Sequence, residues 1–424
     1  MLSINKIYCW LFVFALLIQI PSVHLFKFAD ELLAVIMMCL VGLDVFVNKK
    51  IKKYAMLWVV AFIMAFYAIY SMIFLSYNTP IAIAHDYITQ MKPFCYFYVS
   101  YAVVPHLNTF VRRTLRKICL LNAFVSILCI ITGQVETVFS HVTYLGLVSV
   151  LTFMVYLIAS TEENGNISQK NLIVAVLILT IGLFCTRSKF YGEYVMALYM
   201  LFVYIPGFSK KIKPKHICTF VAAVILVLIV SWNKIEFYFI TAGSDAIMSE
   251  DLLMQMARPM LYGGMIALLL MHPLLGSGLA SFATNASSSA VNYSEAYSAI
   301  GLDIVWGLSP DYDAFICDAY YPSLAQFGII GIILYIAFFV WIYKRLGLLL
   351  YKQGKLLYSV GIMSIVVLMI EGIAATTFNQ PAGAMCMMIL GFLLSQFKNM
   401  SKIELREIRQ GDYKDKKALD FIKK

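Results

Sequence analysis

The chain has 424 residues, of which 62% are hydrophobic and only 13% are charged. Soluble domains have roughly 45–50% apolar and about 25% charged residues, so a water-soluble fold of this length is excluded. The net charge of +10 does not indicate nucleic acid binding, because the basic residues stand in short runs between apolar segments. That arrangement is the orientation signal of membrane proteins.

Apolar segments recur along the chain at the length that a membrane span requires, which is about 20 residues. The first resembles a signal peptide, but no small-residue cleavage site precedes Pro21, and we interpret it as a span. The predicted spans lie near 6–24, 29–47, 54–75, 93–111, 118–133, 142–160, 172–187, 190–206, 217–233, 322–343, 356–373 and 381–397. The sequence therefore predicts an all-α integral membrane protein with about twelve transmembrane helices.

The distribution of Lys and Arg sets the expected orientation. With a cytoplasmic N-terminus, the runs at 49–53, 112–117, 210–215 and 344–355 and the basic tail all lie inside. The cations left outside are Lys27, Lys92, Arg187, Lys189, Lys234 and Arg258. This asymmetry follows the positive-inside rule and predicts that both termini are cytoplasmic.

The apolar stretch 259–280 is long enough to pass for a thirteenth span. Counting it would turn Lys344, Arg345 and the basic tail outward, against the charge rule. We therefore expect a surface-lying or shallowly re-entrant helix on the outer side. The chain then divides into transmembrane helices at 1–233, a large outer loop with short helices at 234–321, transmembrane helices at 322–397 and a basic cytoplasmic tail at 398–424.

The outer loop is the first candidate for chemistry, because connections between helices usually have about 2–8 residues. It is rich in carboxylates and aromatic rings, which hydrogen-bond and stack on sugars. These residues are Glu250, Asp251, Glu295, Asp303, Asp311, Asp313, Asp318, Tyr262, Tyr293, Tyr297, Trp306, Tyr312, Tyr320 and Tyr321. The alternative is a solvated loop with interfacial aromatics. The nine cysteines contain no pair at metal spacing, so no metal or other cofactor is expected.

The outer cations Arg187, Lys189 and Arg258 are candidates for binding a pyrophosphate group, because positive-inside bias acts against their presence there. Arginine offers a planar fork of donors that suits phosphate oxygens. An (i, i+4) ion pair with Glu193 is the alternative for Lys189. A snorkelling interfacial anchor is the alternative for Arg187.

Asp318 is the candidate general base for an acceptor hydroxyl, since it stands just before a predicted span, where a carboxylate can have a raised pKa. Its alternative is an interfacial carboxylate. His272 is a second catalytic candidate, with a capping or interfacial role as the alternative. Tyr320, Tyr321 and Glu193 are candidates for sugar binding. Glu371 also lies in an apolar segment and so is a functional candidate, whereas Asp86 and His141 are expected at the interface.

Three runs in the chain resemble motifs of the O-antigen ligase/polymerase superfamily. The run TRSK at 186–189 is similar to its "TgSRga" turn. Arg258 followed by HPLLGSGLASF at 272–282 is similar to its "R … hPllGvGlgnF" stretch. The run DAYYPSLAQFGIIG at 318–331 is similar to its "HNxyLqllaeyGiiG" entry into a helix. All three occur in the order that the family requires.

The resemblance implies a GT-C-like, metal-independent membrane glycosyltransferase of the bacterial inner membrane, with the large loop in the periplasm. Its donor and acceptor would be undecaprenyl-pyrophosphate-linked glycans, in contact with membrane lipids and with a chain-length regulator protein as a further partner. Arg187 and Arg258 would hold the pyrophosphate. The expected activity is polymerisation of O-antigen or capsule repeat units.

One departure from the motif bears on the activity. Ligases of this family carry a catalytic His, and Cys317 stands at that position, followed by Asp318 at the Asn position. Cysteine, with an ordinary pKa near 8.5, is a poor substitute for imidazole. This favours the polymerase branch over the ligase that joins finished chains to lipid A-core. A flippase for the same lipid-linked repeats is the non-enzymatic alternative, against which the long loop counts.

Overall fold

The computed structural model describes residues 4–19, 28–162, 165–203, 250–352 and 354–398. Within these ranges every regular element is a helix, and an isolated bridge joins Ser309 and Tyr312. The all-helical prediction is therefore confirmed for the described residues. The predicted span near 217–233, the start of the predicted loop at 234–249 and the predicted tail after 398 lie outside them.

Among the described residues, four helical stretches are long and apolar enough to cross a membrane: Ile51–Leu75, Thr109–Thr132, Val142–Ser160 and Tyr321–Leu346. Shorter apolar helices occupy Ile4–Leu17, Gln169–Cys185, Ala257–Met271 and Pro381–Ser395. The principal helices are α1 (Ile4–Leu17), α2 (Ala29–Asn48), α3 (Ala55–Tyr70), α4 (Pro80–Val103), α5 (Thr109–Thr132), α7 (Val142–Ser160), α8 (Gln169–Ile181), α9 (Ser188–Leu198), α11 (Glu250–Met271), α13 (Gly328–Leu346), α15 (Lys355–Glu371) and α16 (Pro381–Ser395). The described part of the chain thus has the helices of a membrane protein.

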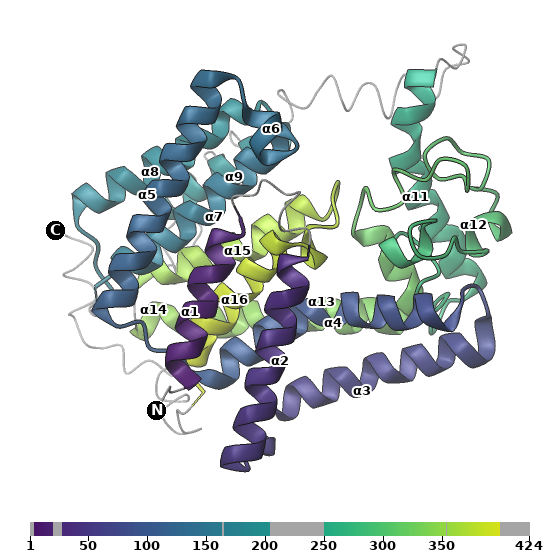
Figure 1. The fold of residues 1–424 in the computed structure, drawn as a ribbon, viewed down its shortest axis with the longest axis horizontal. Coiled ribbons are helices and arrows are strands. Elements are labelled where there is room, and N and C mark those ends of the chain that lie inside the picture. Colours follow the sequence, from purple (N-terminus) through teal and green to yellow (C-terminus); the bar gives the residue numbers. More distant parts are fainter. Residues whose placement is uncertain (1–3, 20–27, 163–164, 204–249, 353, 399–424) are drawn as a thin grey trace, which may run out of the picture.

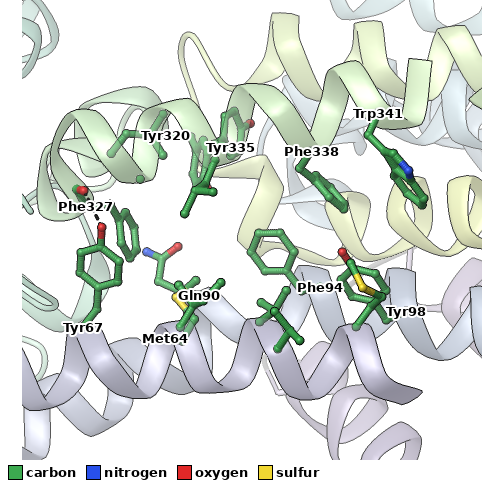
Figure 2. A pocket seen from close by; sticks show the side chains of 17 residues that line it. Met64, Tyr67, Gln90, Phe94, Tyr98, Tyr320, Phe327, Tyr335, Phe338 and Trp341 are labelled. Carbon is green, nitrogen blue, oxygen red and sulfur yellow. Dashed lines mark hydrogen bonds between the residues drawn. The ribbon is translucent and has the colours of Figure 1, made fainter. Parts of the chain in front are cut away.

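Helices α3 and α4 form a hairpin that extends to the lobe containing α11 and the short α12 (Ala296–Ala299; Figure 1). At the start of α4, Thr79 caps the helix by accepting the Ala82 N–H at 3.4 Å, and Pro80 occupies the first turn. The Tyr67 hydroxyl of α3 donates to the carbonyl oxygen of Phe327 at 2.9 Å (Figure 2). This bond fastens α3 to the 3-10 helix η8 (Tyr321–Phe327), from which α13 continues.

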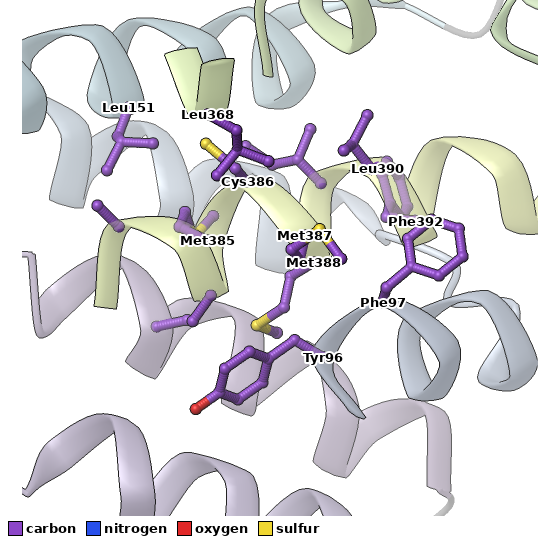
Figure 3. Packing of buried hydrophobic residues seen from close by; sticks show 14 of the residues in the cluster. Tyr96, Phe97, Leu151, Leu368, Met385, Cys386, Met387, Met388, Leu390 and Phe392 are labelled. Carbon is purple, nitrogen blue, oxygen red and sulfur yellow. The ribbon is translucent and has the colours of Figure 1, made fainter. Parts of the chain in front are cut away.

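Helix α16 is the centre of the main bundle. Its residues from Ala382 to Ser395 are all buried, as expected for a helix that is apolar on every side. Its side chains contact Phe97 of α4, Leu151 of α7 and Leu368 of α15 (Figure 3). A Cβ at Gly391 would lie 2.7 Å from the Ser100 Cβ, so only glycine allows α16 and α4 to approach this closely.

The lobe that runs from α11 to Ala319 has a hydrophobic core of its own. Leu261 and Leu268 of α11 are fully buried in it, together with Phe282 and Tyr297, whose ring centroids are 5.1 Å apart. The opposite face of α11 is apolar but exposed, including Leu270 at 78%. One face of α11 therefore belongs to the lobe core, and the other is an exposed apolar face.

The apolar stretch predicted at 259–280 is not one helix, because α11 ends at Met271. Gly276 and Gly278 then adopt left-handed conformations with φ of +77° and +81°. A Cβ at Gly276 would clash with the Ala325 carbonyl oxygen, so this turn requires glycine. The turn that follows α11 brings the chain back against η8.

The two motif segments at 272–282 and 318–331 are joined by backbone hydrogen bonds. Ser277 N–H donates to Ala325 O at 3.1 Å, and Gly278 N–H donates to Gln326 O at 3.0 Å. In the other direction, Ile329 N–H donates to Pro273 O at 2.9 Å. The lobe is therefore attached rigidly to the start of α13.

Side chains of the α3–α4 hairpin also form hydrogen bonds with the backbone of the turn that follows α11. The Asp86 carboxylate accepts the Ala280 N–H at 2.8 Å, and Ser71 Oγ accepts the Leu279 N–H at 2.7 Å. Asp86 is completely buried within the protein, and its expected position at the membrane interface stays a prediction. The lobe covers the Asp86 carboxylate and supplies a donor for it.

Candidate functional site

The first part of the candidate site lies where α9 begins and α15 ends. Lys189 Nζ is 2.7 Å from Glu371 Oε2, and the Thr377 hydroxyl donates to the same oxygen at 3.3 Å. The pair is largely buried, with side-chain exposures of 19% for Lys189 and 3% for Glu371. The suggested pair with Glu193 does not form, because both Glu193 carboxyl oxygens are buried without a hydrogen-bond partner.

Arg187 stands at the N-cap of α9 and reaches toward the start of α7. Its Nη2 is 3.4 Å from His141 Nε2, and the N–H of Thr143 donates to His141 Nδ1 at 3.2 Å. Burial lowers the pKa of His141, and the positive charge of Arg187 lowers it further. His141 therefore releases its proton more readily than a free imidazole does. The N-termini of α7 and α9 both add positive helix-dipole potential here.

The second part of the site comes from the lobe. Arg258 of α11 forms an ion pair with Asp318, through Nη2 and Oδ2. Each side chain is 31% exposed, so both groups remain accessible to a ligand. Burial raises the pKa of Asp318, and the neighbouring Arg258 guanidinium opposes that shift.

Charged groups of both parts of the site act on the Asp318 carboxyl. Besides Arg258, the positive potential of Lys189 and His141 acts on the Asp318 carboxyl. His141 in turn lies within the fields of Arg187, Lys189 and Asp318. Hydrogen bonds also join the two parts, because Tyr320 N–H donates to Gly372 O at 3.0 Å and the Tyr262 hydroxyl donates to Ile373 O at 2.9 Å, directly after Glu371. We call Arg187, Lys189, Arg258, His141 and Asp318 the cation cluster.

Buried donor capacity remains in this cluster. The Nε atoms of Arg187 and Arg258 are both buried without a hydrogen-bond partner. An unsatisfied buried donor of this kind is costly unless a ligand or water accepts from it. A phosphate oxygen is an acceptor that matches a guanidinium fork. Chemically, the cluster is suited to a multiply charged anion beside an accessible carboxylate.

His272 is not part of the cluster. Its Nε2 is 2.9 Å from the Tyr77 hydroxyl, and the two rings are in T-shaped contact. Arg258 stands about four helical turns before His272, which corresponds to roughly 21 Å along the axis of α11 at 1.5 Å per residue. The contacts of His272 are thus those of a residue that fixes the end of α11 to the α3–α4 turn.

The residues predicted to bind sugar lie near the cluster but are largely buried. Tyr320 is 3% exposed and packs on Phe378 with a centroid distance of 4.9 Å. The Tyr321 hydroxyl donates to Met369 O at 2.8 Å. Glu193 is completely buried. Direct contact of these three residues with sugar stays a prediction.

Two residues of this region were missed or underrated by sequence reasoning. His141 was expected at the interface, yet it contacts Arg187. Tyr262, one turn after Arg258, donates to Ile373 O at 2.9 Å and connects α11 with the segment after α15. The (i, i+4) spacing of Tyr262 from Arg258 was a signal that both share one helix face. His141 carried no comparable signal.

Among the described residues no group of three or more His, Cys, Asp or Glu side chains has the arrangement of a metal site. Cys317, which stands in the place of the ligase His, is half-buried, and burial raises its pKa to about 12. Its thiol is therefore protonated at neutral pH. Comparison of the chain with protein-family models and with curated proteins finds no match.

Proposed function

We propose that this protein is a membrane glycosyltransferase that polymerises undecaprenyl-pyrophosphate-linked oligosaccharide repeat units of O-antigen or capsule. The observation that carries the proposal is the Arg258–Asp318 ion pair together with its attachment to the other cations. Tyr262 and Tyr320 donate to Ile373 O and Gly372 O, directly after Glu371, which pairs with Lys189, and Arg187 lies two residues before Lys189. The proposed setting is the periplasmic face of a bacterial inner membrane. About twelve spans of GT-C-like architecture would place both termini in the cytoplasm.

In this proposal the donor pyrophosphate displaces Asp318 from Arg258 and is neutralised by Arg187, Lys189 and Arg258. The freed Asp318 carboxylate accepts the proton of an acceptor hydroxyl. The hydroxyl oxygen forms a bond to the anomeric carbon of the donor sugar, whose bond to the pyrophosphate oxygen breaks. The electron pair leaves with undecaprenyl pyrophosphate. Catalysis is positioning together with electrostatic stabilisation of the leaving group.

The test uses the full-length protein in liposomes that contain only lipid-linked repeat units. A polymerase makes longer lipid-linked glycans and releases undecaprenyl pyrophosphate. A ligase forms product only after lipid A-core is added, and a flippase forms no new bond. The absence of longer glycans from correctly folded protein would contradict the proposal.

Two variants test the cluster itself. Arg258→Ala and Arg187→Ala are each expected to abolish the ladder of polymerised glycan in cells, leaving core with one repeat. Arg113→Ala is the matched control, because Arg113 is an exposed arginine of α5. A full ladder from either cluster variant, at the control's protein level, removes that arginine from the mechanism.

A further inference from the structure

Glu193 of α9 is a buried carboxyl group that the proposed mechanism does not use. Its side chain is completely buried, and neither carboxyl oxygen has a hydrogen-bond partner among the described residues. An ionised carboxylate in this position would lose its hydration without gaining a donor, which is strongly unfavourable. The negative charge of Glu193 therefore has to be neutralised by a proton or by a bound cation.

Glu193 lies beside the Lys189–Glu371 ion pair. Lys189 precedes Glu193 by four positions, so both side chains are on one face of α9. A Cβ at Gly192 would lie 3.7 Å from Ile370 Cδ1, so α9 and α15 are in contact at the residues that adjoin Glu193 and Glu371. Two carboxyl groups thus adjoin one lysine, whose Nζ is 2.7 Å from Glu371 Oε2.

The other titratable groups that face these two carboxyl groups come from the elements packed around them. They are Lys189 of α9, Tyr144 of α7, Cys185 of the 3-10 helix η3 (Gly182–Cys185) and Cys386 of α16. Cysteine and tyrosine are neutral at pH 7 at their ordinary pKa values. Arg187, two residues before Lys189, is directed to His141. Lys189 is therefore the cation of this group, and it offsets only one of the two carboxylates.

We infer that Glu193 is a proton-binding site and is a neutral carboxylic acid at pH 7. The proton lies on Glu193 rather than on Glu371, because Glu371 Oε2 accepts from Lys189 at 2.7 Å and from the Thr377 hydroxyl at 3.3 Å. Donors and a neighbouring cation favour the ionised form of a carboxyl group, whereas burial without donors favours the neutral form. A metal ion is the less suitable ligand, since Lys189 would repel it and no group of three ligating side chains occurs among the described residues.

The bound proton allows Lys189 and Glu371 to pair. An ionised Glu193 would repel the Glu371 carboxylate and, at (i, i+4) spacing, would compete with it for Lys189. The proton removes both effects, so the ion pair joins α9 to α15 across 182 positions of the chain. This role does not depend on the proposed glycan chemistry.

The first experiment is infrared difference spectroscopy of the full-length protein in nanodiscs at pH 7, where an exposed glutamate is ionised. The difference between wild type and Glu193→Gln is expected to contain the C=O band of a carboxylic acid, which shifts in deuterium oxide. Glu136→Gln is the matched control at an exposed glutamate of α6 (Val135–Phe139) and is expected to remove carboxylate bands. Carboxylate bands in the Glu193→Gln difference overturn the inference.

The second experiment measures the unfolding midpoint of wild type and Glu193→Met, which replaces the acid by an apolar side chain of similar length. Glu193→Met is expected to keep or raise the midpoint at pH 7, because the neutral acid makes no hydrogen bond that could be lost. As the pH rises above about 4.3, the wild-type midpoint is expected to fall relative to that of Glu193→Met, because only unfolded wild type releases the Glu193 proton. A parallel pH dependence of the two proteins contradicts the inference.

A metal ion in place of the proton has its own signature, which the wild-type protein alone reveals. The unfolding midpoint is measured in buffers whose cation is sodium, potassium or choline at equal ionic strength. A proton site predicts one midpoint in all three buffers. A midpoint that is higher in sodium or potassium, with a difference that Glu193→Met abolishes, would assign the site to that metal ion and overturn the inference.

Discussion

Replacement of Lys189 by methionine tests how the cation cluster is held together. The change removes the partner of Glu371, which is 3% exposed, and leaves its carboxylate next to buried Glu193. Breaking a buried ion pair in this way costs about 3–5 kcal/mol, because one charge stays buried without compensation. Lys189→Met and Glu371→Met are each expected to lower stability by an amount of that order.

The double variant Lys189→Met/Glu371→Met removes both charges and is expected to recover most of the lost stability. Stability is measured as the unfolding midpoint in detergent, with Lys117→Met as a control at an exposed lysine of α5. Additive losses in the double variant would refute the reasoning, since they would show that the two residues stabilise the fold independently. If Lys189 also contacts pyrophosphate, the double variant regains stability, but cells that express it still lack the ladder of polymerised glycan.

Three further predictions concern single positions. Gly328→Ala is expected to lower the unfolding midpoint strongly, because the φ of Gly328 is +61° and a Cβ there would clash with the backbone of Gly276. A midpoint equal to that of the wild type would mean that the turn relaxes. Arg258→Gln is expected to raise the pKa of Asp318 further, because Arg258 opposes the rise that burial causes. In an infrared titration, with Asp318→Asn as the blank, the carboxyl of this variant takes up its proton at a higher pH. An unchanged titration would show that the pair does not persist in solution. Gly391→Leu is expected to reduce the yield of folded protein by overpacking α16 against α4, whereas normal yield and midpoint would contradict the close approach.

The helical class and the apolar helices were predictable from composition, because lipid selects for long apolar segments. The residue types of the cluster could also be picked out from the sequence, since a cation that is predicted on the outer side, such as Arg187, goes against the positive-inside bias. Their partners were not visible. Lys189 and Glu371 are 182 positions apart, and periodicity instead suggested Glu193, four positions away.

Local sequence misled where a contact depends on packing of distant segments. Asp86 was expected at the interface, and Tyr320 was a candidate for sugar binding. Asp86 is buried because its carboxylate accepts the Ala280 N–H, 194 positions away. Tyr320 is buried because Phe378 covers its ring. Neither partner is marked by spacing, so a single sequence contains no sign of them.

The central position of α16 has a consequence for biogenesis. Every other described helix is synthesised before α16, which fills the middle of the bundle. Gln19 donates to Pro381 O over 362 positions, and Lys398 donates to Ala102 O over 296 positions. Earlier helices therefore enter the bilayer without their main packing partner, and the bundle closes only after the ribosome has completed α16. Until then the surface of α4 around Phe97 lacks the helix that covers it in the folded protein.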